Sequence, residues 1–169
     1  MEMKKVTFAT MLAAISVVID ILVKNLIGTN TIGTAYYAIP ILIAAIFLGF
    51  KYSVVIAILA DAVGVILAGQ PFLPLFMVGP ILWGLIPGLF LNKKSNLLKI
   101  ILVVFGTHLL VTTANSFALY IHIHKSFAAM LAELPLRLLL VIPNSLIIGL
   151  LSNAVKEPML LRESFLNND

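Results

Sequence analysis

Long apolar runs separated by short polar or turn-forming stretches make up most of this chain. The runs cover residues 6–23, 40–50, 53–69, 75–91, 97–121 and 127–151. About 20 apolar residues are enough for a helix to cross the hydrocarbon core of a bilayer, and a helix satisfies its own backbone hydrogen bonds in lipid. The pattern therefore predicts an all-α membrane protein, in which residues 1–169 form a single membrane domain built as a six-transmembrane-helix bundle.

The stretches between the runs are rich in turn formers. Residues 24–39 combine glycine, asparagine and threonine with Tyr36 and Tyr37, which is typical of an irregular loop at the membrane interface. Residues 51–52 are expected to form a tight turn. Residues 70–74 contain two prolines and cannot form a regular helix. Residues 152–169 are polar enough that we expect this tail to leave the membrane.

The composition agrees with a membrane protein. Of the 169 residues, 62% are hydrophobic and 11% are charged, and the mean hydropathy is +1.14, whereas a soluble domain has about 25% charged residues. The chain has no cysteine, which excludes disulfides and thiolate chemistry. Asp20 lies near the end of the first run and Lys24 directly follows it, where a signal peptide would carry a small-residue cleavage site. We therefore expect this run to be the first transmembrane helix.

Lysine and arginine are distributed unevenly between the two sets of connections. Segments rich in these residues stay in the cytoplasm, and the bias predicts that both termini are cytoplasmic. The cytoplasmic set would comprise Lys4, Lys5, Lys51, Lys93, Lys94, Lys99, Lys156 and Arg162, and the outer set Lys24 and Lys125. Three irregular loops then share the outer face, where together they could roof a pocket.

The last apolar run contains two charges, Glu133 and Arg137. A charged side chain at the centre of a membrane helix costs about 2.5 to 3.5 kcal/mol on insertion scales, so it usually faces a partner or a cavity. Residues four apart lie on one helix face, so these two side chains can pair with each other. Alternatively, Arg137 holds an anionic ligand, because a guanidinium makes bidentate hydrogen bonds to a carboxylate. Arg137 is thus the leading candidate for a ligand anchor, with Glu133 as its tether.

Other polar and aromatic side chains are candidates for the same pocket. Asp61, in the middle of the third run, is interpreted either as a pocket residue or as an ion-pair partner of Arg137. His108 is interpreted as a hydrogen-bonded packing residue, since no second metal ligand lies three or four residues away. The outer aromatic side chains either belong to the interfacial belt or stack on a flat ring. The candidate substrate-binding residues are Arg137, Asp61, Asn115, Glu133, Phe72, Phe76, Tyr36, Tyr37 and Gln70.

The motifs of several function classes are missing from the sequence. It contains no P-loop, no His-Glu-x-x-His and no catalytic-triad spacing. We therefore expect no ATP hydrolysis, no enzymatic activity, no metal and no cofactor. The weaker alternatives are an intramembrane hydrolase that uses Asp61, His108 and Glu133, and a purely structural subunit.

Small residues recur at helical spacing in two of the runs. Ala9 and Ala13 lie on one face of the first helix, and Gly84 and Gly88 lie on one face of the fourth. Small residues let helices approach closely in lipid, where hydrophobicity gives no drive for association. We interpret Gly84 and Gly88 as close-packing positions. For Ala9 and Ala13, internal packing is the favoured interpretation and docking to a partner subunit is the alternative.

Several segments of the chain together form a recognisable pattern. They are Ala9-xxx-Ala13; Asp-Ala-Val-Gly, Gln-Pro-Phe-Leu-Pro-Leu-Phe and Trp-Gly-Leu-Ile-Pro-Gly-Leu-Phe-Leu within residues 61–91; Asn115; Leu-Pro-Leu-Arg at 134–137; and Ile-Pro at 142–143. Through these segments the chain, from about Val6 to Asn153, resembles the S component, the substrate-binding subunit of an energy-coupling factor (ECF) vitamin transporter, and in particular the folate-type branch. It departs from the pattern of that branch at Leu75 and Met77, where glycine and threonine are expected, and at the tip of the first loop, which lacks the expected arginine.

The resemblance implies a small six-helix subunit of a prokaryotic cell membrane that takes up a vitamin from the outer face. It would dock through Ala9 and Ala13 on a transmembrane coupling subunit and topple within the membrane. Two ATPase subunits would supply the energy, and no nucleic acid would be involved. Folate is the expected vitamin because the motifs resemble the folate-type branch. Its carboxylates would suit Arg137, and its flat pterin would suit Asp61 and the aromatic side chains. Pantothenate and hydroxymethylpyrimidine are the alternatives.

Overall fold

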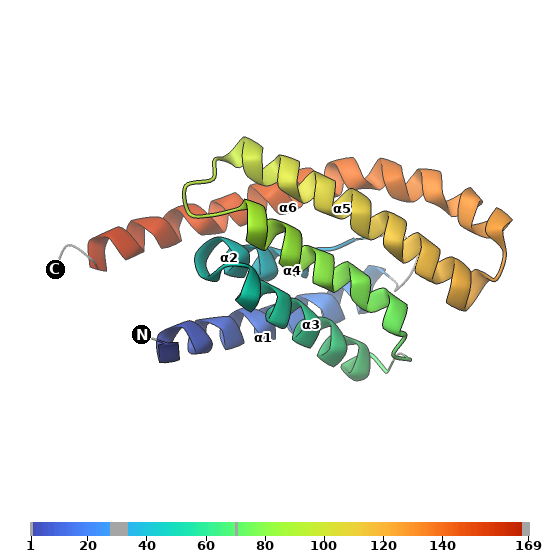
Figure 1. Cartoon of the computed structure of the whole chain (residues 1–169), viewed down its shortest axis with the longest axis horizontal. Coiled ribbons are helices and arrows are strands. Elements are labelled where there is room, and N and C mark those ends of the chain that lie inside the picture. Colours follow the sequence, from blue (N-terminus) through green and yellow to red (C-terminus); the bar gives the residue numbers. More distant parts are fainter. Residues whose placement is uncertain (1, 28–33, 70, 167–169) are drawn as a thin grey trace.

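Helices account for nearly all of the structure (Figure 1). The computed structural model describes residues 2–27, 34–69 and 71–166, and these ranges contain no strand, which confirms the prediction of an all-α chain. The elements are α1 (Glu2–Ile27), α2 (Ala38–Leu48), α3 (Phe50–Leu67), the 3-10 turn η1 (Pro74–Met77), α4 (Val78–Phe90), α5 (Leu97–Leu119), the π-helical turn η2 (Tyr120–His124) and α6 (Phe127–Leu166).

Successive helices run in opposite directions, so the two ends of the chain lie at the same end of the bundle (Figure 1). Within the described residues, four helical segments are long and apolar enough to cross a membrane, and α2 and the segment 74–90 are shorter apolar helices. The long segments are Met3–Val23, Phe50–Leu67, Leu97–Ile123 and Phe127–Leu161. These helices agree with the prediction of an integral membrane protein. The predicted number of crossings, six, stays a prediction.

The short helix α2 forms the centre of the bundle. Every side chain from 41 to 46 on this helix is buried. Its residues contribute to two clusters of buried apolar side chains. One cluster joins α2 to α4 and α5 around Trp83, and the other joins α2 to α1 and α3 around Ile56. Burial of apolar surface on all sides of α2 thus ties the longer helices together.

A single glycine joins α2 to α3. Gly49 has a φ of 83°, a left-handed conformation that glycine adopts without steric cost. Its N–H lies 3.2 Å from the carbonyl oxygen of Ala44 and 3.1 Å from that of Ala45, and its own carbonyl accepts a hydrogen bond from the N–H of Ser53 at 3.2 Å. The turn was predicted at residues 51–52, which instead lie inside α3. Gly49 forms the turn because it ends one helix and begins the next.

The largest difference from the predicted boundaries lies in α6. The last run was predicted to end at residue 151, but the helix continues to Leu166. Its continuation packs against the bundle, where Ser152 and Lys156 are buried. The Lys156 ammonium donates to the carbonyl oxygen of Ser95 at 2.7 Å and lies 3.1 Å from the Glu157 carboxylate. Polar side chains therefore end the apolar run without ending the helix.

Two glycines bring α4 into direct contact with α3. A Cβ atom on Gly84 would lie 2.5 Å from the Cα of Val54 and 2.7 Å from the carbonyl oxygen of Ser53, and Gly88 meets the Cα of Phe50 in the same way. The Ser53 hydroxyl donates to the carbonyl oxygen of Gly84 at 2.7 Å. Such close approach allows two helices to pack tightly in lipid. The predicted close packing at Gly84 and Gly88 is confirmed.

We expect Gly84→Ala to lower the stability of the protein by about 1 to 3 kcal/mol, because the added methyl group would push α3 and α4 apart. Gly106→Ala is the matched control, since nothing lies within 4 Å of a Cβ built on Gly106. Alanine in a helix interior is favoured over glycine by about 1 kcal/mol, so this control should be neutral or stabilising. Thermal unfolding of the two purified variants in detergent compares them, and equal midpoints would contradict the prediction.

Candidate functional site

A cavity of about 350 Å³ lies towards the end of the bundle remote from the two termini. This volume is in the range of small-molecule sites, about 300 to 1,000 Å³. Among the described residues, every α-helix except α2 contributes side chains to the lining. The polar part of the lining comprises Asp20, Thr34, Tyr37, Asp61, His108, Thr112, Asn115 and Arg137, and the rest is apolar or aromatic.

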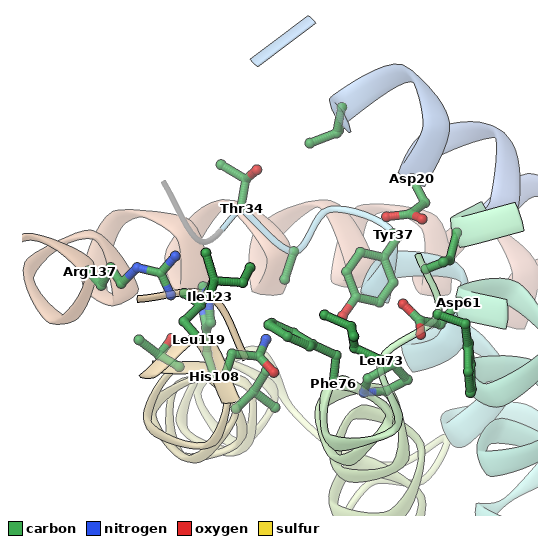
Figure 2. Close-up of a pocket in the computed structure, with 18 of the residues that line it drawn as sticks. Asp20, Thr34, Tyr37, Asp61, Leu73, Phe76, His108, Leu119, Ile123 and Arg137 are labelled. Atoms are coloured by element: carbon green, nitrogen blue, oxygen red, sulfur yellow. The ribbon is translucent and has the colours of Figure 1, made fainter. Parts of the chain in front are cut away.

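Arg137 of α6 forms one end of the cavity (Figure 2). Its side chain is only 6% exposed, and its Nε lies 3.7 Å from Oε2 of Glu133, one helical turn away. The Glu133 side chain is 38% exposed and does not belong to the lining of this cavity. Arg137 therefore pairs with Glu133, as one of the two alternatives predicted, and it also faces the cavity, while its role as a ligand anchor stays a prediction.

Two carboxylates, Asp61 of α3 and Asp20 of α1, lie at the opposite end of the cavity from Arg137 (Figure 2). Tyr37 lies beside both of them in the same view. Asp61 was predicted either as a pocket residue or as the partner of Arg137, and its position across the cavity favours the pocket role. An acidic end and a basic end thus face each other across one cavity.

Sequence reasoning missed Asp20 as a site residue. This side chain is only 5% exposed and it packs against α3 at Gly64, where an added Cβ would meet its carboxylate oxygen. Gly64 follows Asp61 by three residues, so both carboxylates lie near one face of α3. A usable signal was present, because a charge inside an apolar helix marks a functional position by default. The same signal singles out Asp61 and Arg137, and it applies equally to Asp20.

The predicted aromatic residues divide into two groups. Tyr37, Phe72 and Phe76 line the cavity, and Phe72 remains 52% exposed at its rim. Tyr36 is absent from the lining, and its hydroxyl donates to Oδ1 of Asn144 on α6 at 3.1 Å. Gln70 and the loop residues 28–33 lie outside the described part of the chain. Three of the four predicted aromatic residues therefore face the space that a ligand would occupy.

The segment before α2 is held in place by the helices on either side of it. The hydroxyl of Ser16 on α1 donates to the carbonyl oxygen of Tyr37 at 2.7 Å, and Tyr36 bonds to Asn144 of α6. These two bonds connect α1 and α6 through residues that stand next to each other in the sequence. They place the Tyr37 ring in the cavity and turn the Tyr36 ring away from it.

His108 and Asn115 of α5 lie along the side of the cavity. Nδ1 of His108 lies 3.2 Å from the hydroxyl of Ser145, and its ring centroid lies 5.5 Å from that of the buried Trp83. This agrees with the interpretation of a hydrogen-bonded packing histidine. The amide oxygen of Asn115 is buried, with no hydrogen-bond partner in the described part of the protein. Asn115 therefore offers an acceptor that a ligand could use.

Ala9 and Ala13 lie away from the cavity, in the other half of α1. Ala9 belongs to the buried cluster that α1 forms with α2 and α3, and Ala13 packs against the same cluster. Large apolar side chains are exposed on this helix, for example those of Met11 and Ile15. The structure thus gives these alanines an internal packing role, and a docking role for this helix is taken up below as a proposal.

Comparison with protein families shows which family the chain matches. A family model described as "ECF transporter, substrate-specific component" matches residues 4–159, nearly the whole chain. Comparison with curated proteins gives no match. The matched range includes every residue that lines the cavity.

The bond between Tyr36 and Asn144 should contribute to stability, because it fixes the segment before α2 against α6. In a double-mutant cycle of Tyr36→Phe and Asn144→Leu, we expect a coupling energy of about 0.5 to 1.5 kcal/mol, the usual net contribution of a hydrogen bond. Thermal unfolding of the four proteins in detergent measures it. Strictly additive effects of the two substitutions would contradict the bond.

Proposed function

Because the chain belongs to the family of substrate-specific components of ECF transporters, we propose that it captures a vitamin from the extracellular side of a prokaryotic cell membrane, with folate as the best candidate. Members of this family are substrate-binding membrane subunits of an importer rather than enzymes. The observation that carries the proposal is the cavity with Arg137 at one end, two carboxylates at the other and aromatic rings between them.

An outward-facing cavity agrees with the charge distribution. The cations assigned to the cytoplasm belong to the ends of α1, α3, α5 and α6 that surround the two termini, and to the connection between α4 and α5. The cavity lies towards the other end of the bundle. With positive charge retained in the cytoplasm, the cavity faces the outside. In this orientation we propose six crossings, with both termini in the cytoplasm.

Folate is proposed because its chemistry matches both ends of the cavity. A carboxylate of folate would bind the guanidinium of Arg137 by charge-assisted hydrogen bonds. The aminopyrimidine edge of the pterin would donate to Asp61, and the ring would stack on Phe76 or Phe72. Pantothenate would use Arg137 alone, and hydroxymethylpyrimidine would use Asp61 and the aromatic rings. These two vitamins are the alternatives for the same role.

Delivery of the vitamin would require partners. We propose that α1 docks on a transmembrane coupling subunit, that the bundle then topples within the membrane, and that two ATPase subunits supply the energy. Ala9 and Ala13 would support docking by keeping α1 close to α2 and α3. The larger exposed side chains of α1 would then contact the partner.

A fluorescence titration of the purified protein tests the choice of vitamin. Trp83 is the only tryptophan of the chain and its ring lies 5.5 Å from His108, which lines the cavity. A bound ligand should therefore change its emission. Folate, pantothenate and hydroxymethylpyrimidine are added in turn, and calorimetry provides a matched measurement because folate itself absorbs ultraviolet light. If another of these vitamins binds and folate does not, that vitamin replaces folate as the proposed substrate. If none binds, the proposal is overturned.

Arg137→Ala should weaken folate binding by at least about thirtyfold, because removal of one partner from a buried charge pair costs 2 kcal/mol or more. Lys125→Asn is the matched control, since Lys125 is an exposed cation near the same end of the bundle, and asparagine tolerates its left-handed backbone conformation (φ 50°). Glu133→Gln should have a smaller effect, because Glu133 does not line the cavity and would act on the ligand through the arginine. Unchanged binding by a folded Arg137→Ala protein would rule out Arg137 as the anchor.

A further inference from the structure

The acidic and basic side chains of the cavity lie at opposite ends of it. Asp20 and Asp61 lie at one end and Arg137 lies at the other (Figure 2). Asp20 and Arg137 are 5% and 6% exposed, respectively. Ionised groups at such low exposure are stable only when the protein or a ligand supplies hydrogen bonds and opposite charge. A ligand that fills this cavity therefore meets an acidic end and a basic end.

The two carboxylates converge because of a specific contact between α1 and α3. Gly64 leaves room for the Asp20 carboxylate against the backbone of α3, one turn after Asp61. A carboxylate has about four acceptor sites, so each group retains acceptor capacity even when a protein partner occupies part of it. Two carboxylates side by side suit a group with several N–H donors, such as an amidine, an aminopyrimidine or an ammonium ion.

The side of the cavity also favours a ligand with N–H donors. The buried amide oxygen of Asn115 is a further acceptor with no partner in the described part of the protein. Phe76 and Tyr37 line the space between the two ends and suit a flat ring. Acceptors thus lie at the acidic end and along the side, and the strong donor Arg137 lies at the far end. A purely anionic ligand without N–H donors would leave the acidic end unmatched.

We infer that Asp20 is a second ligand-binding carboxylate, and that the cavity takes a dipolar ligand whose N–H-rich ring binds between Asp20 and Asp61 and whose acidic group binds Arg137. The inference rests on the proposed function. It adds Asp20 as a binding residue and states which end of the ligand binds at which end of the cavity. Folate meets this description and pantothenate does not. The ligand would lie along the cavity, with its ring nearest to α1 and α3.

The test uses four probes on the purified full-length protein: folate, p-aminobenzoylglutamate as its acidic half, hydroxymethylpyrimidine as an isolated donor ring, and pantothenate as an acid without a ring. In the wild type, folate should bind at least about tenfold more tightly than p-aminobenzoylglutamate, because hydrogen bonds to charged groups contribute that much. Asp20→Asn should remove most of this difference. It should weaken folate and hydroxymethylpyrimidine and leave p-aminobenzoylglutamate within about twofold of its wild-type affinity.

Two further variants separate a ligand contact from a structural effect. Asp61→Asn should repeat the pattern of Asp20→Asn. Glu157→Gln removes a carboxylate that pairs with Lys156 outside the cavity and should leave all four affinities unchanged. Thermal unfolding reports whether each variant is folded. The comparison of folate with p-aminobenzoylglutamate on the wild-type protein tests the dipolar ligand even if a variant does not fold.

The outcomes distinguish this inference from the proposed function. If the wild type binds none of the probes, the proposed vitamin-capture role fails together with the inference. If it binds pantothenate alone, or p-aminobenzoylglutamate as tightly as folate, the vitamin-capture role stands and the dipolar ligand is overturned. Equal weakening of folate and p-aminobenzoylglutamate by Asp20→Asn would overturn the role of Asp20.

Discussion

An ionised side chain inside an apolar helix bundle needs a polar partner, because neither lipid nor apolar side chains can solvate it. Among the described residues, the charged side chains that are buried are Asp20, Arg137 and Lys156. Lys156 satisfies this need within the protein, through Ser95 and Glu157, and in doing so it fastens the end of α6 to the connection between α4 and α5. Asp20 and Arg137 line a cavity, and Arg137 also pairs with Glu133. Buried charge thus accompanies a closed polar contact at one end of the bundle and a polar cavity towards the other end.

The central position of α2 explains how distant parts of the chain meet at the cavity. Its apolar side chains attach it to α1 and α3 on one side and to α4 and α5 on the other. The residues just before it bond to α1 through Ser16 and to α6 through Asn144. A helix that supplies no described residue to the lining therefore positions most of the helices that do. The packing that forms the core around α2 therefore also determines how the cavity-lining helices are arranged.

Hydrophobicity made the helices and several site residues predictable from the sequence. Apolar runs locate the helices because lipid demands regular backbone hydrogen bonds, and Arg137 and Asp61 stand out because charge is rare in such runs. The positions of Asp20 and Tyr36 depend instead on tertiary packing, namely the contact of Asp20 with Gly64 and the bond of Tyr36 to Asn144. Local pattern carries no information about either contact. The extension of α6 was missed for the related reason that Lys156 and Ser152 are polar yet buried.

The one-residue connection at Gly49 has a consequence for the geometry of the site. Without a loop, α2 and α3 have no slack between them, and close contacts with Gly84 and Gly88 hold α3 against α4 as well. Tyr37 precedes the first residue of this hairpin and Asp61 lies on its second helix. The spacing between the phenol and the carboxylate is therefore set by covalent connection and helix packing. The acidic wall of the cavity is in this sense a preformed template, whose dimensions are fixed before any solute arrives.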